Sequence, residues 1–272
     1  VGFTTVVTFS ETMEMLTQTQ VLANRADSGT RMLSVVPPGL ATEPILPKFE
    51  HGRLGRDLGV NGIKTMADGS TQGCSAALSE TPPGPQYQRL PKGECAPADG
   101  RMNYTTKQLT DLLRPLWKTG LWRFETHANG NRGIEMALGI YAQLQSEKEN
   151  KHTATIIHAT VGDIVAWGIA AQVKQGFIQR PRQKRLDFPG VKLHFSHLIG
   201  HVAYWGAVFE RQLGSRELEH EMCGHDLRRA GEVGAKRGHC LGSGIGRAAD
   251  AFRRGVGPFH RRGARAGALE GL

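Results

Sequence analysis

The chain has 272 residues and carries 34 Lys and Arg against 25 Asp and Glu, a net charge of +9. A β/α barrel of about 250 residues would use nearly all of this length. No apolar run approaches the roughly 20 residues that cross a bilayer, and the first residues lack a signal-peptide pattern, which excludes a membrane partner from our expectations. The four cysteines are widely spaced with no CxxC pair, so we expect neither a disulfide framework nor a zinc knuckle, and a cytoplasmic location.

Strands and helices alternate along the first 226 residues. The chain opens on a strand-like segment without an initiator Met, which we interpret as a piece of a longer reading frame. The pattern predicts strands at 3–9, 30–36, 62–66, 121–126, 153–157 and 191–198. It predicts helices at 11–24, from Thr105 through Pro115, at 134–146 and at 161–173. Strands that alternate with helices of 10–15 residues indicate βαβ units and a parallel sheet, here with six of the eight strands of a barrel.

Two segments differ in composition from this pattern. Residues 69–102 form a connection rich in Pro, Gly and Ser, of a length typical of a functional loop. Residues 227–272 hold ten Lys and Arg against three Asp and Glu, so most of the net charge belongs to the C-terminal tail. From residue 231 this tail is open to three interpretations: a basic arm for nucleic acid, a disordered terminus, or a gene read out of frame. Residues 175–190, with a basic run at 180–185, resemble a local insertion between a helix and its strand, to which the out-of-frame interpretation also applies.

Polar residues stand at the ends of three predicted strands, where a β/α barrel builds its active site. His127 and His158 each end a strand and precede small residues. Neutral imidazole is the commonest Zn²⁺ ligand, and two on adjacent strands can share one ion. Taken singly, each histidine is more typical of a hydrogen-bonded core or rim position. Lys64 is a candidate reactive amine, although its spacing alone favours a structural role, either as a Lys whose amine extends to solvent or in a salt bridge with Asp68.

A group of histidine and aromatic side chains follows the last predicted strand, and we interpret it as pocket lining. It comprises His194, His197, His201, Tyr204 and Trp205. The i, i+4 spacing of His197 and His201 suits a metal site on a helix, but the HExxH pattern is absent. The aromatic members also suit an ordinary core.

Several of these segments resemble the amidohydrolase superfamily, and within it the amidohydrolase family 3 branch that includes N-substituted formamide deformylases. The matching blocks lie in the family's order at 62–64, 67–73, 76–78, 126–131, 155–159 and 199–206. The resemblance implies an α/β fold, an incomplete TIM-type (β/α)8 barrel over residues 1–230, with the flanking β-sandwich missing and residues 231–272 as a separate tail.

The resemblance also implies the site residues. His127 and His158 would bind one or two zinc or other divalent ions. Lys64 would be a metal ligand with a catalytic, bridging and sometimes carboxylated role. The substrate contacts would be Asp68, Asn129, His201, Tyr204 and Trp205.

The implied activity is hydrolysis of amide-type, non-peptide C–N bonds by metal-activated water on a small-molecule substrate. Three features of the family are not matched. Its first-strand His-x-His would precede Val1, Cys240 to Gly244 replace its eighth-strand Asp motif, and Asn131 replaces an acidic residue. We therefore expect an incomplete and weakly active fragment.

Other interpretations remain open beside this one. A separate chain could complete the fragment, and a homo-oligomer is compatible with it. The alternative from another class is a non-catalytic degenerate barrel whose basic tail binds nucleic acid or acidic partners, a partner class that we do not favour. Salt-sensitive DNA binding that disappears on removal of residues 231–272 would support that alternative.

Overall fold

The computed structural model describes residues 5–24, 31–42, 53–54, 58–79, 100–179 and 182–197, together with Val208 and Gln212. The predicted tail at 231–272 and the predicted pocket residues His201, Tyr204 and Trp205 lie outside these residues. Among the residues that it does describe, no helix is long and apolar enough to span a membrane.

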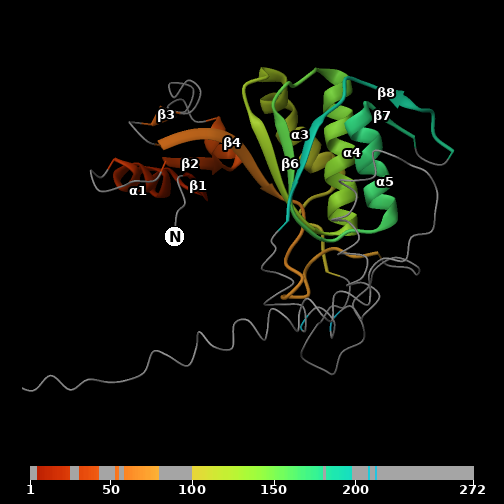
Figure 1. The fold of residues 1–272 in the computed structure, drawn as a ribbon, viewed down its shortest axis with the longest axis horizontal. Coiled ribbons are helices and arrows are strands. Elements are labelled where there is room, and N and C mark those ends of the chain that lie inside the picture. The colour runs from red at the N-terminus through yellow and green to blue at the C-terminus, as the bar shows by residue number, and fades with distance from the viewer. Residues whose placement is uncertain are drawn as a thin grey trace, which may run out of the picture.

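Within the described residues, a curled sheet of six parallel strands forms the centre of the fold (Figure 1). Its strands, in spatial order, are β1 (Thr5–Phe9), β2 (Arg31–Val36), β4 (Leu58–Met66), β5 (Arg123–Gly130), β6 (Thr153–Val161) and β9 (Lys192–Ser196). The spatial order follows the chain order without reversal. A doubly wound sheet reverses at a switch point, whereas a barrel does not. The structure therefore confirms the predicted incomplete TIM-type barrel.

Helices separate these strands, and the sequence predicts all of the described ones except the short helix Pro38–Ala41. They are α1 (Met13–Ala23), α2 (Pro38–Ala41), α3 (Thr106–Thr119), α4 (Asn131–Glu147) and α5 (Ile164–Gln175). A capping box between Thr105 and Gln108 starts α3, which continues through Pro115 and ends at Gly120 with φ of 68°. Helix α4 starts three residues earlier than predicted, because Gly130 provides its N-cap.

Short strands lie beside the main sheet. Strand β3 (Arg53–Leu54) pairs antiparallel with β4. The predicted insertion after α5 contains a small antiparallel pair, β7 (Phe177–Ile178) with β8 (Leu186–Asp187). The Arg185 guanidinium lies 3.9 Å from the centre of the Phe177 ring. This segment therefore has local structure of its own between α5 and β9.

The hydrophobic core lies between the sheet and the helices, where α4 and α5 run side by side (Figure 1). Its largest buried side chains include Trp117 of α3, Phe124 of β5 and Tyr141 of α4. The Trp117 ring centre is 4.9 Å from that of Phe124 and 5.6 Å from that of Tyr141. The Tyr141 hydroxyl also lies 2.7 Å from the Thr126 hydroxyl, so the same aromatic residue anchors α4 to β5 through a buried hydrogen bond.

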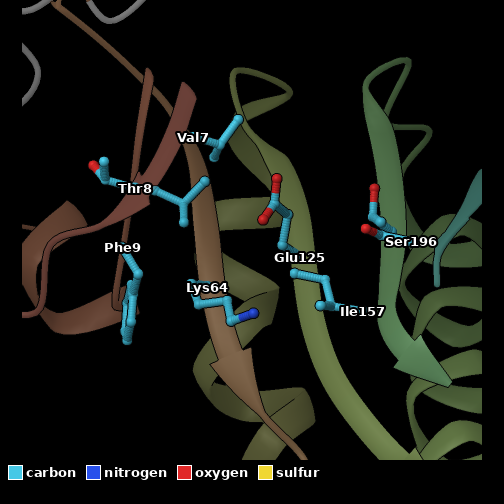
Figure 2. Close-up of a pocket in the computed structure, with 9 residues that line it drawn as sticks. Val7, Thr8, Phe9, Lys64, Glu125, Ile157 and Ser196 are labelled. Atoms are coloured by element: carbon cyan, nitrogen blue, oxygen red, sulfur yellow. The ribbon is translucent and has the colours of Figure 1, made fainter. Parts of the chain in front are cut away.

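The opposite, concave face of the sheet carries the alternate side chains of each strand, because side chains alternate between the two faces of a strand. On β5, Phe124 and Thr126 are buried under the helices, and Glu125 and His127 are directed to the concave side. A pocket of about 320 Å³ lies on this face (Figure 2). It is lined by Val7, Thr8, Phe9, Val35, Lys64, Glu125, Thr155, Ile157 and Ser196.

The segment that follows β4 folds over the ends of β4 and β5 and forms a loop that we call the rim loop (residues 67–79). An isolated bridge joins Asp68 to Met102, and the Ser70 carbonyl accepts the backbone N–H groups of Ser75 and Ala76. Cys74 of this loop is disulfide-bonded, and its partner lies outside the described residues. The cysteine spacing, from which we expected no disulfide framework, gives no sign of this bond at Cys74. Disulfides are rare in reducing compartments, so the bond at Cys74 weighs against the cytoplasmic location that we expected. That location stays a prediction.

Candidate metal centre

Two histidines from neighbouring strands meet at the carboxyl ends of β5 and β6. The strands pair in parallel, with Ala128 opposite His158. The ring centres of His127 and His158 are 4.7 Å apart, and the ring planes are nearly perpendicular at 80°. Two imidazoles that bind one Zn²⁺ at 2.0–2.1 Å have ring centres on the order of 5 Å apart. The separation of the two rings therefore matches that of two ligands on one ion.

The backbone at His158 adopts an uncommon conformation. His158 has a φ of 71° and Ala159 a φ of 48°, and the β5–β6 register shifts between Ala128 and Gly130. Residues other than glycine rarely occupy this left-handed region, and each such residue costs about 1–3 kcal/mol. His158 does not end its strand as the sequence predicts, because β6 continues through His158 and Ala159 to Val161. Backbone strain of this kind concentrates at functional sites.

His127 is held by the rim loop and by its own strand. Its Nε2 lies 3.0 Å from the Gly69 carbonyl oxygen and 3.0 Å from Asn129 Nδ2. Burial, the largest cause, lowers the pKa of His127, the Gly69 hydrogen bond opposes it, and the charge of Lys64 lowers it further. The neutral form, which is the form that binds metal, is therefore favoured at neutral pH.

Asp68 anchors the rim loop to the end of β5. Its carboxylate accepts the backbone N–H groups of Ala77 at 2.9 Å, Asn129 at 2.9 Å and Gly130 at 2.7 Å. Burial raises the pKa of Asp68 to about 6, and these backbone hydrogen bonds oppose the rise. The side chain is fully buried, and its hydrogen bonds hold the rim loop against the end of β5. The predicted substrate contact by Asp68 stays a prediction, and its burial weighs against it.

Lys64 lies deeper in the concave face than the two histidines. The register places Lys64 opposite Glu125 and Met66 opposite His127, so Lys64 leaves the sheet two residues, or about 6.6 Å, below His127. Figure 2 shows the Lys64 and Glu125 side chains in the same pocket. Burial lowers the pKa of Lys64, and the charge of Glu125 opposes this shift. The carboxylate of Asp68 is engaged by backbone N–H groups, so the structure does not support the salt bridge between Lys64 and Asp68.

The histidines of β9 contribute less directly. His194 lies in β9 opposite Thr155, and β6 separates it from Glu125. His197 follows β9 rather than lying on a helix, and its Nδ1 is 3.0 Å from the His158 carbonyl oxygen. The His197 ring stacks on Phe195 at 5.9 Å. His197 thus supports the backbone that carries His158, and the helical i, i+4 interpretation fails at its first residue.

Comparison with known proteins supports the architecture. The sequence matches no protein-family model and no curated protein. Two solved structures are similar to it, each described as an uncharacterized metal-dependent hydrolase. The protein from Pyrococcus furiosus is 17% identical with a TM-score of 0.54 over 78% of this chain, and that from Pyrococcus horikoshii OT3 is 17% identical with a TM-score of 0.55 over 79%. This chain spans 37% of the length of either structure. At this identity the likeness shows a common fold.

A divalent metal, as the two similar structures are described to require, fits the donors of this chain in part. The two imidazoles meet at one rim, and burial favours the metal-binding form of His127. Within the described ranges, no three His, Cys, Asp or Glu side chains converge on one point. Four-coordinate zinc would therefore need Lys64, water or groups outside these ranges as further ligands.

Two residues near the site escaped the sequence analysis. Glu125 lines the pocket and forms an ion pair with Arg123. Its two-residue spacing from His127 on one strand was the signal that could have identified it. Thr160 donates a hydrogen bond of 2.6 Å to Asn129 Oδ1. No motif in the sequence marks Thr160, because its importance depends on a pairing between two strands.

Proposed function

We propose that this chain carries part of the active-site rim of a metal-dependent hydrolase that cleaves amide-type, non-peptide C–N bonds. The observation that carries the proposal is the pairing of His127 and His158, 4.7 Å apart at the ends of adjacent parallel strands. Active sites of β/α barrels are built at this end of the sheet. The fold that the chain has in common with two metal-dependent hydrolases supports the same class.

In this proposal the two histidines hold the metal, and Lys64 stands below them as the third candidate ligand. The bound metal would supply an activated water near neutral pH and polarise the substrate carbonyl. His127 is kept in place by the rim loop, and His158 lies on the strained backbone of β6. The pocket beneath the rim would accept a small substituent of the substrate, because it is about 320 Å³ in volume.

The finer assignment rests on the sequence motifs. Their order resembles the amidohydrolase family 3 branch, so we propose zinc as the metal and N-substituted formamides as one candidate substrate class. The pocket combines Thr155 and Ser196 hydroxyls with the apolar Ile157, which suits a small group of mixed polarity.

We further propose that the chain alone turns over slowly. Asp68 Oδ1 lies 3.9 Å from His127 Nε2, but both carboxylate oxygens of Asp68 already accept backbone N–H groups. Asp68 is therefore poorly placed to accept a proton from water during the reaction. The sequence offers no match to the family's eighth-strand Asp, which would perform this task.

The test is to measure zinc content and hydrolysis of N-substituted formamides by the purified 272-residue chain. The proposal predicts weak zinc binding that requires His127 and His158, with negligible turnover. Stoichiometric, tightly held zinc with clear turnover would refute the incomplete site. Zinc binding that is indifferent to both histidines would refute the site itself.

A further inference from the structure

Asn129 is buried behind the histidine pair, and every polar group of its side chain is engaged. The residue is 3% exposed. Its Nδ2 lies 2.8 Å from the Gly69 carbonyl oxygen, and its Oδ1 accepts the Thr160 hydroxyl at 2.6 Å. An amide with this environment is closed to a substrate. The burial of Asn129 therefore weighs against the predicted substrate contact. Its hydrogen bonds indicate a structural role instead.

The orientation of the Asn129 amide follows from its partners. A carbonyl oxygen can only accept, so the Asn129 atom beside the Gly69 carbonyl must be the nitrogen. The Thr160 hydroxyl then donates to the remaining oxygen. Thr160, which is 1% exposed and lies on the neighbouring strand β6, thus holds the oxygen end of an amide whose orientation the Gly69 carbonyl has set.

The same contacts determine the proton position on His127. The Gly69 oxygen, Asn129 Nδ2 and His127 Nε2 form a nearly equilateral triangle with sides of 2.8, 3.0 and 3.0 Å. The angle between the two N–H bonds of an amide is wider than the angle at Nδ2 in this triangle. Only one N–H of Asn129 can therefore be directed at either the Gly69 oxygen or His127 Nε2. If that bond serves the Gly69 oxygen, a lone pair on Nε2 would face the same oxygen and repel it. A proton on Nε2 instead gives the Gly69 oxygen two donors, which is its full capacity.

The Gly69 carbonyl itself is held firmly. The Gly69 N–H donates to the Ser75 carbonyl at 3.1 Å, and a side chain at Gly69 would collide with Ser75. The backbone N–H of Asn129 donates to Asp68 at 2.9 Å, one residue before Gly69. Asn129 therefore connects β5 to the rim loop through two hydrogen bonds, one from its backbone N–H to Asp68 and one from its side chain to Gly69. His127 contacts the same Gly69 carbonyl.

We infer that Asn129 and Thr160 are positioning residues that fix the ring of His127 for metal binding, an inference that rests on the proposed function for its metal-binding part. Thr160 holds the oxygen of the Asn129 amide in place, and Asn129 and His127 together donate to the Gly69 carbonyl. His127 is then held with its proton on Nε2. Residues that fix a metal-binding histidine through its second nitrogen commonly change metal affinity by about 10–100-fold when they are removed.

The test compares Thr160→Val, which removes the hydroxyl, with Thr160→Ser, which retains it, and with Asn129→Leu. Thr65→Val is the matched control, because Thr65 also makes a buried hydroxyl hydrogen bond, 2.9 Å to Thr126, without contact to this group. Each metal-free chain is labelled with ¹⁵N-histidine, and the hydrogen exchange of the His127 Nε2–H proton is measured by NMR. Zinc dissociation constants are then measured by calorimetry on the folded fraction.

We expect a protected Nε2–H in the parent chain, Thr160→Ser and Thr65→Val, and a rapidly exchanging one in Thr160→Val and Asn129→Leu. Zinc binding should weaken roughly 10–100-fold in the latter two variants. A proton on Nδ1 in the parent chain, or equal protection in Thr160→Val, would overturn the inference. If the protection changes as expected but the parent chain binds no zinc, the positioning role stands and the proposed function fails.

Discussion

The imidazole rings of His127 and His158 stand nearly perpendicular, with their centres 4.7 Å apart, although the residues are separated by a helix and two loops. The parallel pairing of β5 with β6 brings them together, since residue 128 lies opposite residue 158. The first ring is fixed by hydrogen bonds and the second stands on a strained backbone. The position of His127 thus depends on hydrogen bonds and that of His158 on its backbone conformation, so the two proposed ligands can be tested separately.

Gly130 is a position where the rim admits no side chain. A Cβ at Gly130 would collide with the Ala77 carbonyl oxygen, so Gly130→Ala must displace the rim loop from β5. We expect the free energy of unfolding to fall by about 1–3 kcal/mol or more. Gly168→Ala in α5 is the control, because it meets no atom within 4 Å and should stabilise the helix by up to about 1 kcal/mol. Urea unfolding of both variants makes the comparison, and equal effects would contradict the close approach at Gly130.

Asp68 should make stability depend on pH. Its pKa in the folded chain is about 6, above its ordinary value of 3.8, so the folded state retains a proton that the unfolded state has lost between these values. The contribution of Asp68 to stability is therefore present below about pH 4 and is lost as the pH rises to 6. The loss amounts to about 3 kcal/mol.

The measurement is urea unfolding of the parent chain and of Asp68→Asn at several values from about pH 4 to pH 7, which span the interval between the two pKa values. The parent chain should lose stability relative to the variant as the pH rises, because Asn does not titrate. Parallel curves for the two proteins would show that burial does not perturb Asp68.

Glu125 should control the charge of Lys64. Burial lowers the pKa of Lys64, and Glu125 opposes the shift, so Glu125→Gln should lower the pKa of Lys64 further. The pKa can be followed by NMR of ¹³C-dimethylated lysines, with Lys64→Arg to assign the signal. Glu147→Gln, which removes a carboxylate that pairs with Arg114, is the control and should leave Lys64 unchanged. An unchanged or higher pKa in Glu125→Gln would contradict the shared pocket.

The architecture could be predicted from the sequence because its signals were local. Six β-branched runs and the helices between them indicated the strands and their parallel pairing, and β4, β5 and β6 lie where the pattern places them. The boundaries were harder to predict: β5 extends to Gly130, four residues beyond the predicted end, because pairing with β6 continues past a register shift. Tertiary pairing determined those ends, and the sequence does not show it.

The candidate site was predictable only where a residue's role follows from its place on a strand. His127 and His158 were found in this way. Asp68 and Asn129 were assigned to the substrate, but the structure buries both. Their burial results from the rim loop folding back across β5, a contact between residues 61 positions apart. No local pattern encodes such a contact, and the same reason hid Thr160.

The most direct test of the account is a double-mutant cycle for zinc binding with His127→Ala, His158→Ala and the combined variant, measured by calorimetry on the 272-residue chain. If both rings bind one ion, each single variant should lose most of the zinc affinity, and the combined variant should lose little more. Independent, additive losses, or an affinity that neither substitution changes, would show that the two histidines do not share a metal.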